Sequence, residues 1–161
     1  RQFLGDEGSR FDGHAFREIV QGGVGADQIS GAGGFDAIAG GAGDDVLRGG
    51  RNADQVRGGP GDDWLFGGRG HDTLIGGRGD DVIRGGFGGD RFVYSAGNDL
   101  IEDFHLGDND QFQIQVGLAY ELQQQGHDLQ VITALGTTTL LGVDQDLLQN
   151  QNWIISDQMV V

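Results

Sequence analysis

The chain has 161 residues, no cysteine and a formal net charge of −15, and its length suits one ordinary domain or two small ones. The excess of acid argues against nucleic acid as a partner, because phosphates would be repelled, and it favours cations. The absence of cysteine excludes disulfides, thiolate catalysis and zinc sites built on cysteine.

The first 21 residues are expected to form a lead-in or capping segment. No signal-sequence pattern is recognisable, and no run approaches the roughly 18 apolar residues of a transmembrane segment. The first residue is arginine, so we expect the chain to be a piece of a longer protein. The stretch FREIVQGG predicts a strand in which Val20 precedes Ile29 by nine residues, whereas residues 1–12 are too irregular to place.

From Gly22 to Val93 the chain consists of eight consecutive nonapeptides without a gap. Glycine supplies 33 residues of the chain, where average usage would give about 11. Glycine occupies positions 1, 2 and 4 of every unit except at Ala32 and Asn52.

Two further positions of the nonapeptide are constant in type. Position 6 is always aspartate, at Asp27, Asp36, Asp45, Asp54, Asp63, Asp72, Asp81 and Asp90. Position 8 is always apolar, at Ile29, Ile38, Leu47, Val56, Leu65, Leu74, Ile83 and Phe92. Each unit predicts a six-residue glycine turn and a three-residue strand whose middle side chain points inward.

The pattern GGxGxDxUx resembles the RTX (repeats-in-toxin) repeat, a hemolysin-type calcium-binding nonapeptide of bacterial proteins exported by type I secretion. The match covers residues 22–93 without a frame shift. The resemblance implies an all-β fold, a right-handed parallel β-roll in which two nonapeptides make one coil, with turns on both edges. Because YSAGNDLIE continues the phase, the roll is expected to span residues 22–102, followed by a C-terminal antiparallel β cap over residues 103–161.

Coils of two nonapeptides would stack the repeat aspartates in two columns. Asp27, Asp45, Asp63 and Asp81 would share one edge of the roll, and Asp36, Asp54, Asp72 and Asp90 the other. Strands lie about 4.8 Å apart, so adjacent carboxylates would repel by roughly 1 kcal/mol in water and about 3 to 4 kcal/mol at an effective dielectric near 20. Calcium binds oxygens at about 2.3 to 2.6 Å, so one ion fits between two stacked carboxylates. We expect about six ions, three on each edge, with more at the ends.

The resemblance assigns the remaining ligands to backbone carbonyls in the glycine-rich parts of two successive turns. The residues concerned are Gly23, Gly25, Gly41, Gly43, Gly50, Asn52, Gly59, Gly61, Gly68, Gly70, Gly77 and Gly79. Asp99 is in phase and is expected to join Asp81 at a further site, while Asp103 and Asp108 form either a capping site or solvated loop acids. Magnesium suits such a large carbonyl cage less well than calcium. The alternative is that the acids only solubilise a glycine-rich linker.

From Phe104 onward glycine becomes rarer, and segments such as DQFQIQV and DLQVITAL alternate or run apolar. They predict antiparallel strands that cap the last coil, with a short helical turn at residues 144–150. The tail resembles the uncleaved C-terminal signal of type I export, in which an acid precedes an apolar cluster, here Asp157 followed by Met159, Val160 and Val161. An ordinary last strand is the alternative.

The predicted function is a calcium-binding module that folds on extracellular calcium, stabilising a larger exoprotein of a Gram-negative-type bacterium and aiding its type I secretion. The expected partners are calcium ions, the secretion machinery and an upstream catalytic or toxin domain. A second interpretation is a polysaccharide-binding or adhesive module. A third is the non-catalytic part of a secreted hydrolase or toxin.

No catalytic site is predicted in this chain, because its histidines form no HExxH motif: His14, His71, His105 and His127. Arginines at turns and strand edges are expected mainly to neutralise the acidic turns, or otherwise to bind an anionic polysaccharide. An outward apolar stripe is expected to be covered by a terminal segment or to contact a partner. It consists of Val46, Trp64, Phe66, Val82 and Leu100.

Overall fold

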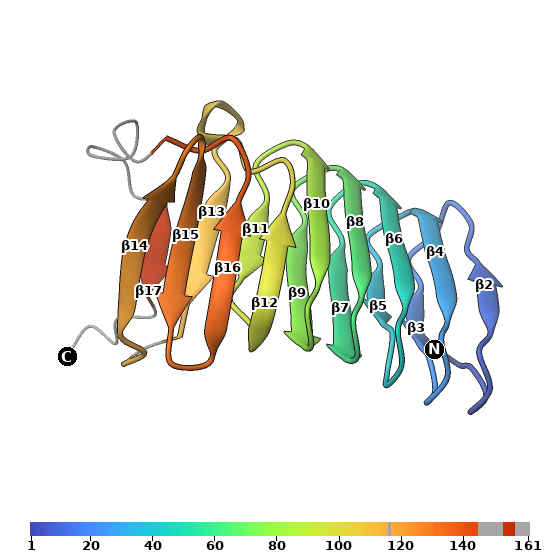
Figure 1. The fold of residues 1–161 in the computed structure, drawn as a ribbon. Coiled ribbons are helices and arrows are strands. Elements are labelled where there is room, and N and C mark those ends of the chain that lie inside the picture. Colours follow the sequence, from blue (N-terminus) through green and yellow to red (C-terminus); the bar gives the residue numbers. More distant parts are fainter. Residues whose placement is uncertain (116, 145–152, 157–161) are drawn as a thin grey trace.

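The computed structural model describes residues 1–115, 117–144 and 153–156. The chain winds into a parallel β-roll with two sheets, and each coil adds one strand to each sheet (Figure 1). Sheet A consists, in spatial order, of β1 (Gln2–Phe3), β3 (Ile19–Gln21), β5 (Ala37–Ala39), β7 (Gln55–Pro60), β9 (Thr73–Arg78), β11 (Arg91–Val93), β13 (Gln111–Ile114) and β17 (Ile154–Ser156).

Sheet B lies in front of sheet A in Figure 1. It consists, in spatial order, of β14 (Tyr120–Gln125), β15 (Asp128–Thr133), β16 (Gly136–Leu140), β12 (Gly97–Ile101), β10 (Val82–Phe87), β8 (Trp64–Arg69), β6 (Val46–Arg51), β4 (Gln28–Gly33) and β2 (Arg10–Asp12). Within the described ranges, the structure contains no helix with the length and apolarity needed to span a bilayer.

The register of the parallel strands repeats every two nonapeptides. Val46 pairs with Trp64, which pairs in turn with Val82, so residues at the same repeat position form rows across each sheet. The position-8 side chains point between the sheets and are at most 3% exposed. Each such burial stabilises the fold by about 1.5 to 3 kcal/mol. The predicted parallel roll with one inward apolar side chain per nonapeptide is confirmed.

The central strands are longer than the sequence predicts. From β6 to β10 each strand has six residues, because the glycine pair after positions 7 to 9 continues the ladder, as Gly50 does with Gly68. Glycine is a weak strand former, and propensity alone does not predict this extension. Both exceptions to the glycine rule, Ala32 and Asn52, have the left-handed backbone of the glycines at these positions, with φ of 68° and 74°.

The two ends of the chain extend the sheets beyond the clear repeats. Strands β1, β2 and β3 place part of residues 1–21 on the same two sheets, and Val20 joins the core. At the other end β15 runs antiparallel to both β14 and β16, as expected of the cap, and β16 joins β12 of sheet B in parallel. Strands β13 and β17 instead continue sheet A in parallel, because the chain returns to that sheet from the same edge as before.

Aromatic side chains close the C-terminal end of the core. The ring centroid of Phe104 lies 5.7 Å from that of Phe92 and 6.2 Å from that of Trp153, and all three side chains are buried. Residues 145–150 of the predicted helical turn lie outside the described residues, as do the tail residues Asp157, Met159, Val160 and Val161.

Candidate metal centre

Buried carboxylates form a ladder along each edge of the roll. Edge 1, where the chain passes from sheet A to sheet B, carries Asp27, Asp45, Asp63, Asp81 and Asp99. Edge 2, where it passes from sheet B to sheet A, carries Glu18, Asp36, Asp54, Asp72, Asp90 and Asp110. The aspartates of both ladders are at most 5% exposed. The two predicted columns of repeat aspartates are therefore present.

One oxygen of each carboxylate is fixed by the preceding coil. The backbone N–H of Asp45 donates to Oδ1 of Asp63 at 2.8 Å, and that of Asp54 donates to Oδ1 of Asp72 at 2.8 Å. The same bond recurs along both ladders with a spacing of 18 residues through the repeats. Successive carboxylates are thus held in the same orientation.

The second oxygen has no such partner through the middle of the ladders. Among the described residues, Oδ2 is buried without any hydrogen bond in seven aspartates: Asp36, Asp45, Asp54, Asp63, Asp72, Asp81 and Asp90. A buried charged oxygen without a partner costs several kcal/mol. Rows of such atoms at equivalent positions indicate that a cation belongs beside them.

The glycine at position 1 makes room for these oxygens. A β-carbon at Gly49 would lie 2.6 Å from Oδ2 of Asp54 and 2.7 Å from the carbonyl oxygen of Gly67. The same pair of oxygens, one from a carboxylate and one from the next coil's backbone, converges at Gly31 and Gly67. Since the φ of Gly49 is not in the left-handed range, this glycine is required for space. The sequence prediction named positions 2 and 4 as ligands and missed position 1, although glycine recurs there in every unit.

The predicted backbone ligands at positions 2 and 4 lie in close stacks from coil to coil. Gly50 and Gly61 have φ of 118° and 137°, and a β-carbon on either would clash with the carbonyl oxygen of the residue one coil earlier. Their role as metal ligands stays a prediction.

Burial raises the pKa of the ladder aspartates from Asp36 onward above the ordinary value of 3.8. Loss of hydration is the main cause, and charges of neighbouring acids add to it, so that the pKa of Asp63 reaches about 7 and that of Asp81 about 8. Burial likewise raises the pKa of Asp54 and Asp90 to about 7. The backbone hydrogen bond to each carboxylate lowers its pKa, but by less. Burial and mutual repulsion therefore disfavour the ionised form of these carboxylates at neutral pH.

The ligand chemistry fits calcium. The oxygens that converge beside the position-1 glycines come from carboxylates and backbone carbonyls, as those of Asp54 and Gly67 do at Gly49. Sites made of carboxylate and carbonyl oxygens select hard cations, and a flexible cage of this kind suits calcium better than magnesium.

The last members of the ladders have their oxygens satisfied by protein donors. Oδ2 of Asp99 accepts a hydrogen bond from Oγ of Ser95 at 3.0 Å, and Oδ2 of Asp110 accepts one from the backbone N–H of His105 at 2.7 Å. Asp110 follows Asp90 by 20 residues, an interval that breaks the phase, so the nonapeptide pattern does not reveal it.

The two acids of the predicted capping site have different surroundings. The carboxylate of Asp103 accepts hydrogen bonds from the backbone N–H groups of Gly85 and Gly86, each at 2.9 Å. Asp108, in the short 3-10 helix η1 (Leu106–Asp108), lies 3.5 Å from Nδ1 of His105. A calcium ion shared by these two acids stays a prediction.

Lowering the pH is expected to stabilise the metal-free roll. Because the pKa of Asp63 and its equivalents is higher in the folded state than the ordinary 3.8, the folded chain takes up protons that the unfolded chain does not. Stability should therefore rise as the pH falls from about 8 to about 5. Far-UV circular dichroism of the chelated chain should show more β-sheet at pH 5 than at pH 8, and equal spectra would contradict the burial of these carboxylates.

Comparison with known proteins agrees with this geometry. The family model described as RTX calcium-binding nonapeptide repeat matches residues 12–47, 21–56, 30–65, 39–74 and 66–101. Among solved structures, the extracellular lipase LipA from Serratia marcescens is similar with a TM-score of 0.50 and 18% sequence identity. The similarity covers 92% of this chain and 40% of the lipase chain. No curated protein matches the sequence significantly.

Proposed function

Since the chain belongs to the family of RTX calcium-binding nonapeptide repeats, we propose that the roll is a switch that folds when it binds extracellular calcium. By folding it would stabilise a larger bacterial exoprotein and aid its type I secretion. The observation that carries this proposal is the pair of rows of buried Oδ2 atoms without a hydrogen bond, seven atoms in all among the described residues, with one row on each edge. Such a row opposes folding unless a cation neutralises it.

Three kinds of group in the chain have different roles in holding the ions. The carboxylates supply the negative oxygens, the backbone N–H of the preceding coil orients each of them, and the position-1 glycines leave the space into which carboxylate and carbonyl oxygens converge. Bound calcium supplies the positive charge that offsets the ladder. The number of ions follows from the number of stacked carboxylate pairs, which gives about six within the clear repeats.

Calcium-gated folding explains how such a chain could be exported. In a cytosol poor in free calcium the chain would stay unfolded and able to pass through a narrow conduit, and millimolar calcium outside would fold it. Weak sites, with dissociation constants of about 0.1 to 1 mM, suit this change of compartment. The acidic charge of −15 keeps the unfolded chain soluble.

The roll itself is proposed to be non-catalytic, with any active site elsewhere in a longer protein. The chain spans 40% of the lipase chain that it resembles, which leaves room for a catalytic or toxin domain in a protein of that size. A calcium titration of the metal-free chain, followed by far-UV circular dichroism with magnesium as the control, tests the folding switch. No gain of β-sheet signal with calcium would refute it.

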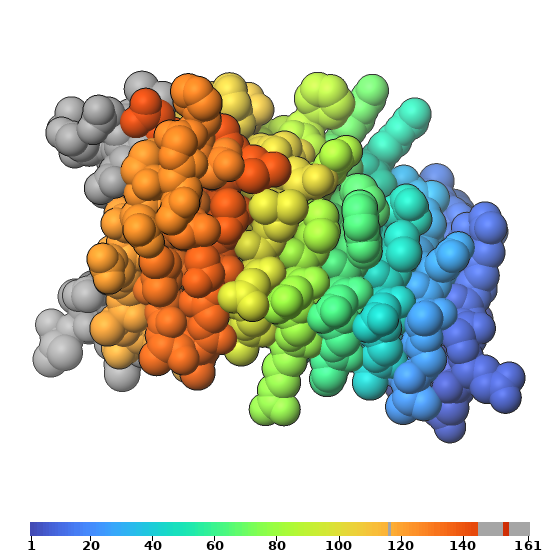
Figure 2. Space-filling model, viewed as in Figure 1, coloured from blue at the N-terminus to red at the C-terminus, as the bar shows by residue number. Residues whose placement is uncertain are grey.

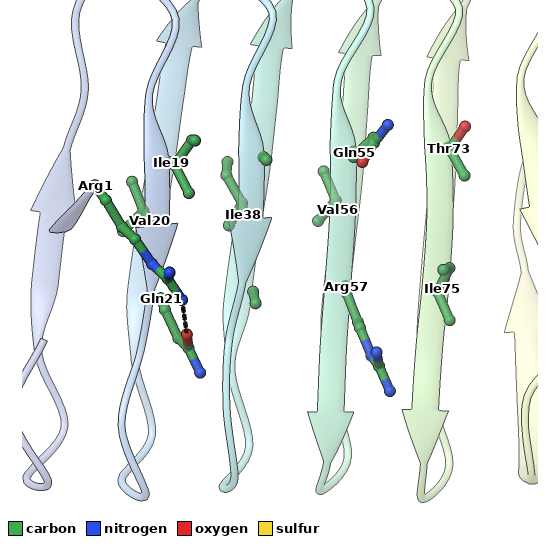
Figure 3. A pocket seen from close by; sticks show the side chains of 12 residues that line it. Arg1, Ile19, Val20, Gln21, Ile38, Gln55, Val56, Arg57, Thr73 and Ile75 are labelled. Atoms are coloured by element: carbon green, nitrogen blue, oxygen red, sulfur yellow. Dashed lines mark hydrogen bonds between the residues drawn. The ribbon is translucent and has the colours of Figure 1, made fainter. Parts of the chain in front are cut away.

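Polysaccharide binding or adhesion is the second candidate, favoured by a hollow of about 330 Å³ on the outer face of sheet A. The hollow lies over the small side chains of Ala37 and Ala39. Figure 3 shows Gln55 and Arg57 on one side of it and Arg1 on the other. Polar and cationic groups around an apolar floor suit a sugar ring that carries a carboxylate.

Contacts of the arginines and of Trp64 also bear on this candidate. The guanidinium groups of Arg48 and Arg69 lie over the rings of Phe66 and Phe87, with Cζ 5.0 and 5.8 Å from the ring centroids; neutralisation of the acidic turns by these arginines stays a prediction. Figure 2 shows side chains projecting from the edge at which β6, β8 and β10 end. Trp64, in the middle of the apolar stripe, is 49% exposed, which favours a partner contact over a cover by a terminal segment.

Glycan-array binding in the presence of calcium separates the two candidates. If the second is correct, acidic glycans should bind, and Arg57→Gln should weaken their binding while the calcium-induced folding stays unchanged. Absence of binding to any acidic glycan would leave the folding switch as the function and exclude the second candidate.

A further inference from the structure

The edge 2 ladder continues into the first coil beyond the recognisable repeats, where its member is Glu18. The backbone N–H of Glu18 donates to Oδ1 of Asp36 at 2.7 Å, which is the bond that links the aspartates elsewhere. Oε1 of Glu18 accepts a hydrogen bond from the backbone N–H of His14 at 3.3 Å. Its other oxygen, Oε2, is buried without a hydrogen-bond partner in the described structure, as is Oδ2 of Asp36.

The corresponding end of edge 1 is closed by protein groups. There the ladder ends at Asp27, and the equivalent residue one coil earlier is Ser9, whose backbone N–H donates to Oδ1 of Asp27 at 2.6 Å. Oδ2 of Asp27 accepts a hydrogen bond from the backbone N–H of Gly23 at 2.8 Å. Edge 1 thus leaves no unsatisfied carboxylate oxygen at its N-terminal end, whereas edge 2 leaves two.

The space that the position-1 glycines leave beside the carboxylates is also present at the N-terminal end of edge 2. Gly13 occupies position 1 in the repeat frame of Glu18, and a β-carbon there would lie 2.5 Å from the carbonyl oxygen of Gly31. Next to it, a β-carbon at Gly31 would clash with Oδ2 of Asp36. At the equivalent position of edge 1 the chain has Leu4, whose side chain packs against the core. In the coil before the first clear repeat, space and an unsatisfied carboxylate oxygen therefore occur together on edge 2, whereas edge 1 has a leucine and a serine at the equivalent positions.

The neighbouring imidazole does not account for the charge of Glu18. Nδ1 of His14 lies 3.9 Å from Oε1, and the His14 side chain is 79% exposed while that of Glu18 is 18% exposed. An ion pair at this distance in which one partner is so exposed contributes little. The buried oxygen that lacks a partner is Oε2, on the opposite side of the same carboxylate.

We propose that Glu18 and Asp36 hold a further calcium ion at the N-terminal end of edge 2, with a glutamate where the repeat uses aspartate. The proposal rests on the proposed function, since it extends the same ladder by one member. The segment GHAFREIVQ lacks glycine at positions 2 and 4, so the nonapeptide pattern does not reveal this site. The roll would consequently hold one more ion on edge 2 than the clear repeats provide.

Counting the bound ions tests this site. In equilibrium dialysis against saturating calcium, the chain with Glu18→Gln should bind about one ion fewer than the unmodified chain, counted by elemental analysis as the excess of calcium on the protein side of the membrane. The matched control is Glu7→Gln, which removes an exposed acid of the same coil on edge 1 and should leave the count unchanged.

A second variant separates loss of the site from loss of the fold. Gly13→Ala leaves the charge intact and fills the space beside the Gly31 carbonyl, so it should lose the same ion with the far-UV spectrum of the remaining coils retained. An unchanged ion count in Glu18→Gln would overturn the proposal while leaving the calcium switch standing. If the unmodified chain bound no calcium, the proposed function itself would fail.

Discussion

Removing calcium with a chelator is expected to abolish most of the β-sheet signal of the chain, and returning about 1 mM calcium is expected to restore it. The seven unsatisfied Oδ2 atoms lie at equivalent positions of successive coils, where their charges repel and cannot be hydrated. Six sites with dissociation constants of about 0.1 mM would together contribute about 8 kcal/mol at that concentration. This is the usual margin of stability of a whole domain.

The transition should be cooperative, because each coil pairs only with the coil before it and the coil after it. Far-UV circular dichroism during a calcium titration measures it. The same concentration of magnesium should be much less effective, since magnesium keeps its water ligands and requires a smaller octahedral site. A spectrum unaffected by chelation would mean that packing and backbone hydrogen bonds suffice without metal.

Replacing Asp63 by alanine should raise the calcium midpoint of folding by roughly two- to threefold. Asp63 lies in the middle of edge 1, where its backbone N–H binds the carboxylate of Asp81 and its own carboxylate is bound by the N–H of Asp45. The substitution therefore weakens two neighbouring sites, each of which contributes about 1.4 kcal/mol when calcium is tenfold above its dissociation constant.

The neighbouring residue Asp62 provides the control. Asp62 is an exposed acid of the same turn, and its carboxylate accepts only the backbone N–H of Asp80, at 2.8 Å. Asp62→Ala removes the same charge from the same turn but leaves every carboxylate and hydrogen bond of the buried ladder in place, so its midpoint should stay much closer to that of the unmodified chain than the midpoint of Asp63→Ala. Equal midpoints for Asp63→Ala and the unmodified chain would contradict ions held between stacked aspartates.

Features that recur at a fixed phase could be predicted from the sequence. The nonapeptide period, together with the two units per coil that the RTX resemblance implies, places Asp45 beside Asp63 and Leu47 beside Leu65, because a solenoid converts equal spacing along the chain into stacking between coils. The recurrence of glycine at position 1, where no side chain would fit, was also visible in the repeat pattern. The need for space there was missed because a repeated glycine does not show whether it supplies a backbone angle or an absent side chain.

Features that depend on a change of phase could not be predicted in this way. Asp110 joins edge 2 only because the loop containing η1 brings the chain back to sheet A after a longer interval. The parallel pairing of β13 depends on the edge from which the chain returns to sheet A, and a strand pattern carries no information about that edge. Glu18 lies in phase, but its own repeat lacks most of the glycines.

The alternation of strands between the two sheets limits how such a module can change in length. Insertion or deletion of 18 residues, the spacing of the ladder bonds, would add or remove one full coil and leave the outer faces of all others as they are. Loss of a single nonapeptide would keep every aspartate stacked but transfer each downstream strand to the opposite sheet. Outer-face neighbours such as Trp64 and Val82 would then be separated if the lost unit lay between them. Lineages that use an outer face for recognition should therefore differ from one another by even numbers of repeats.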